Sequence, residues 1–119
     1  MKILVVDDDR MVVEAVAYML RGQGYQVLGI SNGMDALKIL EKETIDLLIT
    51  DIMMPDLSGL NLLTMLREFY SLTLPVILIS SMAKEKTARL FARMGVYDFI
   101  AKPIRFDTLL SSVKKILKK

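Results

Sequence analysis

The segment ILVVDDD at residues 3–9 decides the fold, because four apolar residues run without interruption into three aspartates. A short, wholly apolar run is typical of a strand that is covered on both faces, as in a parallel sheet. Further short runs rich in β-branched residues follow along the chain, separated by longer segments whose apolar residues recur at intervals of three and four. This alternation predicts β-α-β units around a central parallel sheet.

The pattern predicts an α/β fold with five strands and five helices. The strands are expected at residues 2–6, 26–30, 46–50, 76–80 and 98–101. The helices are expected at residues 11–21, 34–43, 60–68, 84–94 and 106–117. No stretch rich in proline, glycine or serine interrupts this series, so we expect one domain over residues 1–119.

Composition excludes several classes of protein. A chain of 119 residues has the size of one domain, and 53% apolar residues are enough for a core. The net charge of +2 is too small to indicate direct nucleic-acid binding. The absence of cysteine and histidine excludes disulfides, thiolate metal sites and histidine-based catalysis. Chemistry in this chain must rest on carboxylates, hydroxyls and lysines.

Neither export nor membrane insertion is expected. Only the apolar residues 3–6 separate Lys2 from the first aspartate, whereas a signal peptide needs an apolar stretch of ~7–15 residues. The longest uninterrupted apolar run, residues 15–20, is far short of the ~20 residues that span a bilayer. We therefore expect a soluble, cytoplasmic protein with no membrane partner.

The residues that end the strands are the candidates for function, because ligands of parallel sheets bind outside the carboxyl ends of the strands. These residues are Asp7, Asp8, Asp9, Asp51, Ser80, Ser81, Lys102 and Pro103. All of them are expected at the same edge of the sheet.

Asp7, Asp8 and Asp51 would repel one another at this edge unless a cation lay between them. A set of oxygen ligands without histidine or cysteine favours a hard cation, and Mg²⁺ is the first choice. The alternative is that these aspartates form a solvated turn at the start of the next helix, where anions are favourable. That alternative is preferred for Asp9, as a helix cap, and the metal site for Asp7 and Asp8.

Asp51 begins the segment DIMMPDLSG, residues 51–59, in which Pro55 and Gly59 frame a loop. A carboxylate beside a cation can act as a nucleophile toward phosphorus, and Lys102 and Ser80 could supply a charge and a hydroxyl for the phosphoryl oxygens. Taken singly, these side chains would be read as a turn aspartate, a solvated lysine and a helix cap. Because Pro103 follows Lys102, the backbone there must be extended or cis, which fixes the position of the lysine.

In combination, four segments resemble the receiver domain of two-component response regulators, in particular the stand-alone chemotaxis or phosphorelay type. The segments are ILVVDD at 3–8, Asp51 with Met54, Pro55 and Gly59, the hydroxyl of Ser80 after an apolar strand, and FIAKP at 99–103. The resemblance implies a flavodoxin-like, doubly wound sheet with the strand order 2-1-3-4-5.

The resemblance also implies a site. Asp51 would be the phosphoacceptor, and Mg²⁺ would bind Asp7 or Asp8, Asp51 and the backbone carbonyl of Met53. Ser80 would hydrogen-bond the phosphoryl group, Lys102 would pair with it, and Phe99, otherwise an ordinary core residue, would be the aromatic that rotates.

The function that follows from the resemblance is that of a phosphorylation-controlled switch. A histidine kinase or histidine phosphotransfer protein would donate the phosphoryl group. The face formed by residues 84–94, 98–101 and 106–117 would then change shape to control a downstream protein or a fused output domain. Such a domain is a substrate and a switch, not an enzyme, with at most weak intrinsic autophosphorylation and dephosphorylation that depend on Mg²⁺.

Particular residues also bear on other possible functions. A flavin carrier of the same fold would need a phosphate-binding loop after the first strand, where this chain has three aspartates. A phosphoaspartate hydrolase would need a second acid two residues after the nucleophile, where this chain has Met53. Two alternatives stay open: a receiver cut from a longer regulator, and a docking module that is never phosphorylated. Because the chain ends with the last expected helix, we expect a receiver without an output domain.

Overall fold

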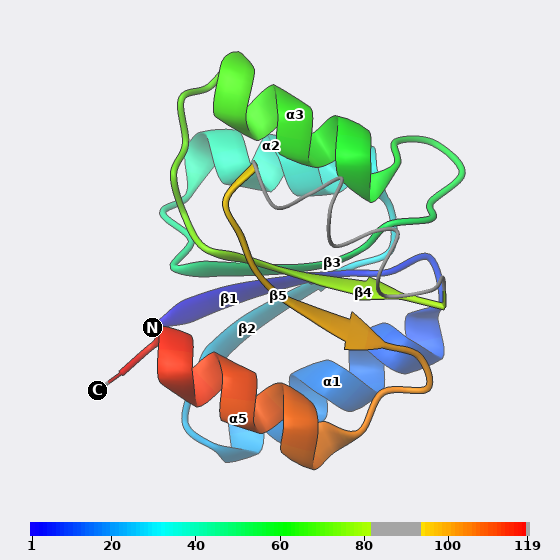
Figure 1. Ribbon diagram of the computed structural model, residues 1–119, viewed down its shortest axis with the longest axis vertical. Helices are drawn as coiled ribbons and strands as arrows, with labels where there is room; N and C mark the ends of the chain where they lie inside the picture. Colours follow the sequence, from blue (N-terminus) through cyan, green and yellow to red (C-terminus); the bar gives the residue numbers. More distant parts are fainter. Residues whose placement is uncertain (82–93, 119) are drawn as a thin grey trace.

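The computed structural model describes residues 1–81 and 94–118. Its centre is a parallel sheet of five strands in the order β2-β1-β3-β4-β5 (Figure 1). The strands are β1 (Lys2–Val6), β2 (Gln26–Ile30), β3 (Leu47–Asp51), β4 (Val76–Ser80) and β5 (Val96–Ala101). The predicted fold class and strand order are therefore confirmed.

Helices cover both faces of the sheet (Figure 1). On one face lie α2 (Gly33–Lys42) and α3 (Gly59–Glu68), and on the other lie α1 (Arg10–Gly22) and α5 (Phe106–Ile116). Four of the five predicted helices are thus present, each within one residue of its predicted ends. The helix predicted at 84–94 falls, except for its last residue, outside the described residues.

The opening apolar run supplies both hydrophobic cores. Leu4 and Val6 pack into the core beneath α2 and α3, and Ile3 and Val5 pack into the core beneath α1 and α5. Successive side chains of a strand point to opposite faces, so a strand between two helical layers must be apolar at every position. This requirement explains why the run shows no polar alternation.

Three strand boundaries differ from the prediction. β3 begins at Leu47 and ends at Asp51, in each case one residue later than predicted. Asp46, just before β3, is bonded to the start of β1: its carboxylate accepts the N–H of Lys2 at 2.7 Å, and its own N–H donates to the carbonyl of Lys2 at 2.8 Å. β5 begins two residues earlier than predicted, at Val96, which pairs with Val76 just before an irregularity in the register.

The helices α1, α2 and α3 each begin after the carboxyl end of a strand or after the loop that follows it, and each has a side-chain cap. Asp9 caps α1 by accepting the N–H of Met11 at 2.9 Å, Asn32 caps α2, and Ser58 caps α3. The preference for a capping role at Asp9 is therefore confirmed. Within the described part of the chain, no helix is both long and apolar enough to cross a membrane.

Candidate functional site

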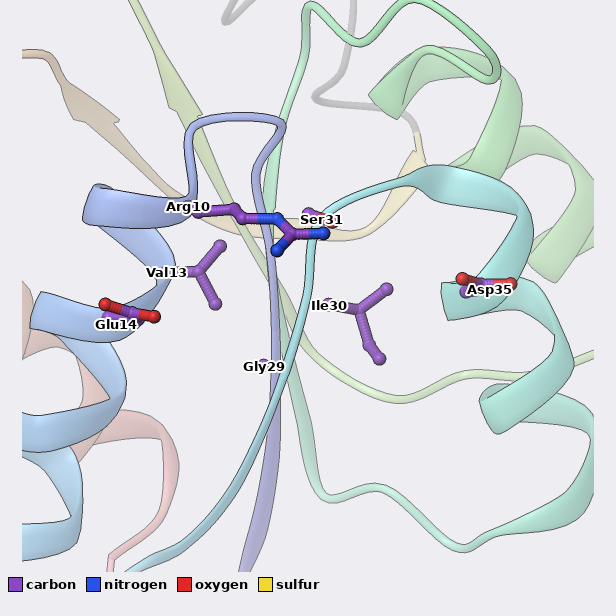
Figure 2. Close-up of a pocket in the computed structure, with 7 residues that line it drawn as sticks. All are labelled: Arg10, Val13, Glu14, Gly29, Ile30, Ser31 and Asp35. Atoms are coloured by element: carbon purple, nitrogen blue, oxygen red, sulfur yellow. The ribbon is translucent and has the colours of Figure 1, made fainter.

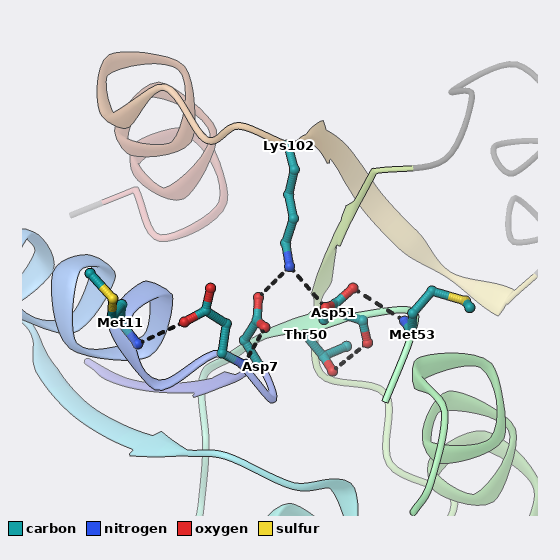
Figure 3. Close-up of polar contacts among 7 residues, drawn as sticks. Asp7, Met11, Thr50, Asp51, Met53 and Lys102 are labelled. Atoms are coloured by element: carbon teal, nitrogen blue, oxygen red, sulfur yellow. Dashed lines mark hydrogen bonds and ion pairs between the residues drawn. The ribbon is translucent and has the colours of Figure 1, made fainter. Parts of the chain in front are cut away.

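The candidate site lies at the carboxyl ends of β1, β3, β4 and β5 (Figure 3). Asp7 directly follows β1, Asp51 ends β3, Ser80 ends β4, and Lys102 directly follows β5. Because β1 and β3 are neighbours in the sheet, the two aspartates come side by side although 44 positions separate them in sequence. The predicted strand ends therefore meet at one edge.

Lys102 joins the two buried carboxylates. Its Nζ lies 2.9 Å from Asp7 Oδ2 and 2.9 Å from Asp51 Oδ2 (Figure 3). Burial lowers the pKa of Lys102, but the contacts with Asp7 and Asp51 raise it by more than burial lowers it. The pKa of Lys102 therefore lies above its usual value. The lysine is thus held as a cation between two anions.

Asp7 is the most deeply buried acid of the site, with no exposed surface. Its Oδ1 accepts the N–H of Asp9 at 2.9 Å, whereas its Oδ2 has ion-pair contact with Lys102 but no hydrogen-bond partner of acceptable geometry among the described residues. Burial raises the pKa of Asp7 and repulsion from Asp51 adds to this, outweighing the Asp9 N–H and Lys102. Burial is therefore the main reason that the charged form of Asp7 is disfavoured.

A cation site can be built from these acids. Asp7, Asp8 and Asp51 each offer one carboxylate oxygen, and the three oxygens lie within 4.8 Å of one another. Asp8 is exposed, whereas the other two acids are buried. Three carboxylate ligands, two of them buried and one exposed, fit a hard metal cation with an open side toward solvent. The predicted acidic cluster is therefore present and could hold a metal.

The loop after Asp51 is held close to this cluster. Met53 donates its N–H to Asp51 Oδ1 at 3.2 Å, and Gly59 donates its N–H to the carbonyl of Ile52 at 2.8 Å. A Cβ at Gly59 would lie 2.4 Å from the carbonyl oxygen of Asp51, so no larger residue fits without displacing the backbone. Pro55 is exposed in the middle of the loop.

These features agree with comparison to known proteins. The family model of the response regulator receiver domain matches residues 3–114. The chain belongs to the response regulator receiver domain family.

Related receiver domains occur in proteins of different kinds. The chain is 35% identical over 118 residues to the alkaline phosphatase synthesis transcriptional regulatory protein PhoP of Bacillus subtilis, covering 99% of this chain and 49% of that protein. It is 37% identical over 114 residues to the CAI-1 autoinducer sensor kinase/phosphatase CqsS of Vibrio cholerae, covering 94% of this chain and 17% of that protein. The chain thus spans about half or less of the length of these relatives.

The fold is shared with solved receiver structures. The receiver domain of the Francisella response regulator 1452 superposes with a TM-score of 0.92 at 28% identity, covering 98% of this chain and 96% of that one. The described part of this receiver domain therefore has the architecture of that solved structure.

The remaining predicted residues surround the acids. Ser80 is fully buried at the end of β4, and its carbonyl accepts the N–H of Lys102 at 2.8 Å. Phe99 is 6% exposed and packs in the core beneath α2 and α3. The Lys102–Pro103 peptide bond is cis, which is one of the two conformations expected there. The roles of these residues after phosphorylation stay predictions.

A separate pocket opens beside the edge strand and does not include the acidic cluster (Figure 2). It lies between α1 and β2, where α1 packs closely on the strand: a Cβ at Gly29 would lie 2.5 Å from Cγ1 of Val13. Arg10, Glu14 and Asp35 form its charged rim. None of the residues predicted for phosphoryl transfer lines this pocket.

Asp56, in the loop after Asp51, is not among the residues that the sequence pattern indicates. Its carboxylate accepts the N–H groups of Gly33 and Met34 at the start of α2. A contact across 22 or 23 positions leaves no local pattern in a single sequence, so periodicity could not have found it.

Proposed function

We propose that this receiver domain accepts a phosphoryl group on Asp51 in the presence of Mg²⁺. One observation carries the proposal: Asp51, only 4% exposed, shares an ammonium group with Asp7 and lies within 4.8 Å, oxygen to oxygen, of Asp7 and Asp8. A structural aspartate would not need two further acids at the end of an apolar sheet. A phosphoacceptor that works with a divalent cation needs such acids, because they bind the cation.

Asp7 and Asp8 would hold the cation together with Asp51 and the carbonyl of Met53. When bound, Mg²⁺ would supply positive charge for the phosphoryl oxygens and relieve repulsion between the acids. A carboxylate oxygen of Asp51 attacks the phosphorus of a phosphohistidine, a P–O bond forms, and the P–N bond breaks with its electron pair returning to the imidazole.

The other residues act on the product. Lys102 already contacts Asp51 Oδ2, so its ammonium group needs to move little to pair with the phosphoryl oxygens. Ser80 would donate its hydroxyl to another oxygen, and Phe99 would change its packing in response, which alters the face that contains β5 and α5. Pro55, Gly59 and Pro103 fix the loops that carry these groups.

The partners follow from the same proposal. The donor is a histidine kinase or a histidine phosphotransfer protein, and the receiver of the signal is a protein target or an output domain in the same chain. The two relatives described above, a transcriptional regulatory protein and a sensor kinase/phosphatase, support a module that serves in either setting. We further propose a cytoplasmic protein, one domain over residues 1–119, and at most weak intrinsic turnover of the phosphoryl group.

A small phosphodonor tests the proposal without knowledge of the kinase. Incubation with acetyl phosphate and Mg²⁺ should add the mass of one phosphoryl group, and Asp51→Asn or excess chelator should abolish the addition. Asp46→Asn is the matched control, because Asp46 lies just before β3, at the opposite end of the strand from Asp51. Labelling that survives Asp51→Asn would overturn the acceptor, and no labelling of the parent would favour a docking module.

A further inference from the structure

The tip of the loop between β3 and α3 is fixed to a different helix, α2. Asp56 Oδ1 accepts the N–H of Gly33 at 3.2 Å, and Asp56 Oδ2 accepts the N–H of Met34 at 3.1 Å. The first N–H groups of a helix have no partner within the helix and carry partial positive charge, so a carboxylate is favourable there. Asp56 therefore bonds α2 with both of its oxygens.

The next residue of the loop strengthens this contact. Gly33 is buried against Leu57, and a Cβ at Gly33 would lie 2.6 Å from the carbonyl oxygen and 2.7 Å from the Cβ of Leu57. Two consecutive loop residues thus meet two consecutive residues of α2. Such close backbone packing leaves little freedom for the loop to slide along the helix.

The base of the same loop is fixed to the sheet. Ile52 donates its N–H to the carbonyl of Ile79 on β4 at 3.1 Å, and Gly59 donates to the carbonyl of Ile52 at 2.8 Å. Residues 53–55 therefore lie between one anchor on the sheet and another on α2. Met53, which hydrogen-bonds Asp51 Oδ1, is the first residue of this segment.

We propose that Asp56 is a positioning residue for the cation site, because its contact with α2 holds the backbone of Met53 beside Asp51. The proposal deepens the proposed function and rests on it, since the Met53 carbonyl is a metal ligand only if the acids bind Mg²⁺. Loss of the α2 anchor would let residues 53–55 move and would weaken Mg²⁺ binding. Supporting groups outside the ligand set typically change metal affinity about tenfold or more when removed.

The chain offers a matched control on the same helix. Asn32 also caps α2, by accepting the N–H of Asp35 at 2.8 Å, but the hydrogen bonds of its side chain to the described residues stay within residues 32–35. Asn32→Ala and Asp56→Ala both remove a cap from α2, and only Asp56→Ala releases the loop. A comparison of the two separates loss of helix stability from loss of loop position.

The experiment is a titration with Mg²⁺ alone, followed by amide chemical shifts, on the parent, Asp56→Ala, Asp56→Asn and Asn32→Ala. We expect the Kd for Mg²⁺ to rise about fivefold to tenfold in Asp56→Ala, less in Asp56→Asn, and less than about twofold in Asn32→Ala. Without Mg²⁺, the amides of residues 53–55 should shift in Asp56→Ala and stay in place in Asn32→Ala.

Each contrary result has a distinct meaning. If the parent bound Mg²⁺ at the acidic cluster and Asp56→Ala bound it with the same Kd, the positioning role would be overturned and the proposed function would stand. An equal rise in Kd in Asn32→Ala would also overturn the positioning role. If Mg²⁺ did not perturb Asp7, Asp8 or Asp51 in the parent, the proposed function would fail, and this role with it. Should Asp56→Ala not fold, Asp56→Asn decides by the same criteria.

Discussion

One ammonium group serves two buried carboxylates in this receiver domain. Lys102 is 2.9 Å from both Asp7 and Asp51, and its side chain is 24% exposed. In a site with little solvent, removal of a charged partner leaves the remaining charges without compensation, which costs more than the pair itself contributes. Removal of the Lys102 ammonium group should therefore destabilise the folded protein.

We predict that Lys102→Met lowers the free energy of unfolding of the metal-free protein by ~1–3 kcal/mol, because Asp7 and Asp51 then face each other unpaired. Urea denaturation in excess chelator measures the change. Lys2→Met is the control, since Lys2 forms an exposed ion pair with Glu43 at 2.8 Å and such pairs contribute less than ~1 kcal/mol. Equal losses in the two variants would argue against a special role for the buried contacts.

The raised pKa of Asp7 predicts a pH dependence with a definite sign. A carboxyl group whose pKa is higher in the folded state contributes most to stability below its usual value of 3.8, and this contribution is lost as pH rises through the raised pKa. In chelator, the parent should therefore lose stability relative to Asp7→Asn as pH rises through that window, and the difference should level off above it.

Asp56 supplies a control of opposite sign. Desolvation raises the pKa of Asp56, but hydrogen bonds from the N–H groups of Met34 and Gly33 lower it more, to below 3.8. Its contribution should be present above pH 3.8 and disappear as pH falls through the lowered pKa. If Asp7→Asn and Asp56→Asn changed the pH profile in the same direction, the assignment for Asp7 would be wrong.

At the scale of the elements, the sequence predicted what depends on local pattern. The β1 run was placed correctly because both its faces are buried, and the start of α1 was placed within one residue because Asp9 is a cap. Contacts between distant segments were not predicted. Arg67 of α3, for example, donates to the carbonyls of Leu72, Leu74 and Met94, and nothing in its neighbouring sequence indicates these acceptors.

The same holds for the site: part of it could be predicted from the sequence and part could not. The acids at the strand ends could be predicted, because parallel strands bring their carboxyl ends to one edge. The sharing of Lys102 between Asp7 and Asp51 could not, because it depends on side-chain distances across β1, β3 and β5. The attachment of the β3–α3 loop to α2 depends in the same way on tertiary packing.

The close approach of α3 to β3 predicts the effect of a single methyl group. Gly59→Ala places a Cβ 2.4 Å from the Asp51 carbonyl oxygen and 2.9 Å from Ile52 Cα, both of which are backbone atoms that cannot turn aside. We expect a loss of ~1–3 kcal/mol in stability and slower labelling of Asp51 by acetyl phosphate. Gly22→Ala is the control, because a Cβ there meets nothing within 4 Å, and it should be neutral or slightly stabilising.

At the scale of the whole molecule, the site exists only when the sheet is complete. Its charged residues are Asp7, Asp8, Asp51 and Lys102. They lie at the carboxyl ends of β1, β3 and β5, in a sheet that helices cover on both faces (Figure 1). The unfolded chain keeps Asp51 far from the other two acids for most of the time. A cation that binds all three acids therefore binds the folded state in preference, and its affinity is added to the stability of the fold.

Mg²⁺ should accordingly raise the melting temperature, and two neighbouring aspartates should respond in opposite ways. At a concentration about a hundred times Kd, binding contributes about 2.7 kcal/mol, on the order of 10 °C for a domain of this size. Asp8→Ala removes one of the three clustered acids, so it should stabilise the metal-free protein and reduce the rise with Mg²⁺. Asp9→Ala removes the cap of α1, so it should lower stability by ~1 kcal/mol and lower the melting temperature both with and without Mg²⁺. The rise in melting temperature that Mg²⁺ produces should stay the same. Thermal melts of the parent and both variants, in millimolar Mg²⁺ and in chelator, measure these changes. A rise that survived in Asp8→Ala but was lost in Asp9→Ala would place the cation elsewhere.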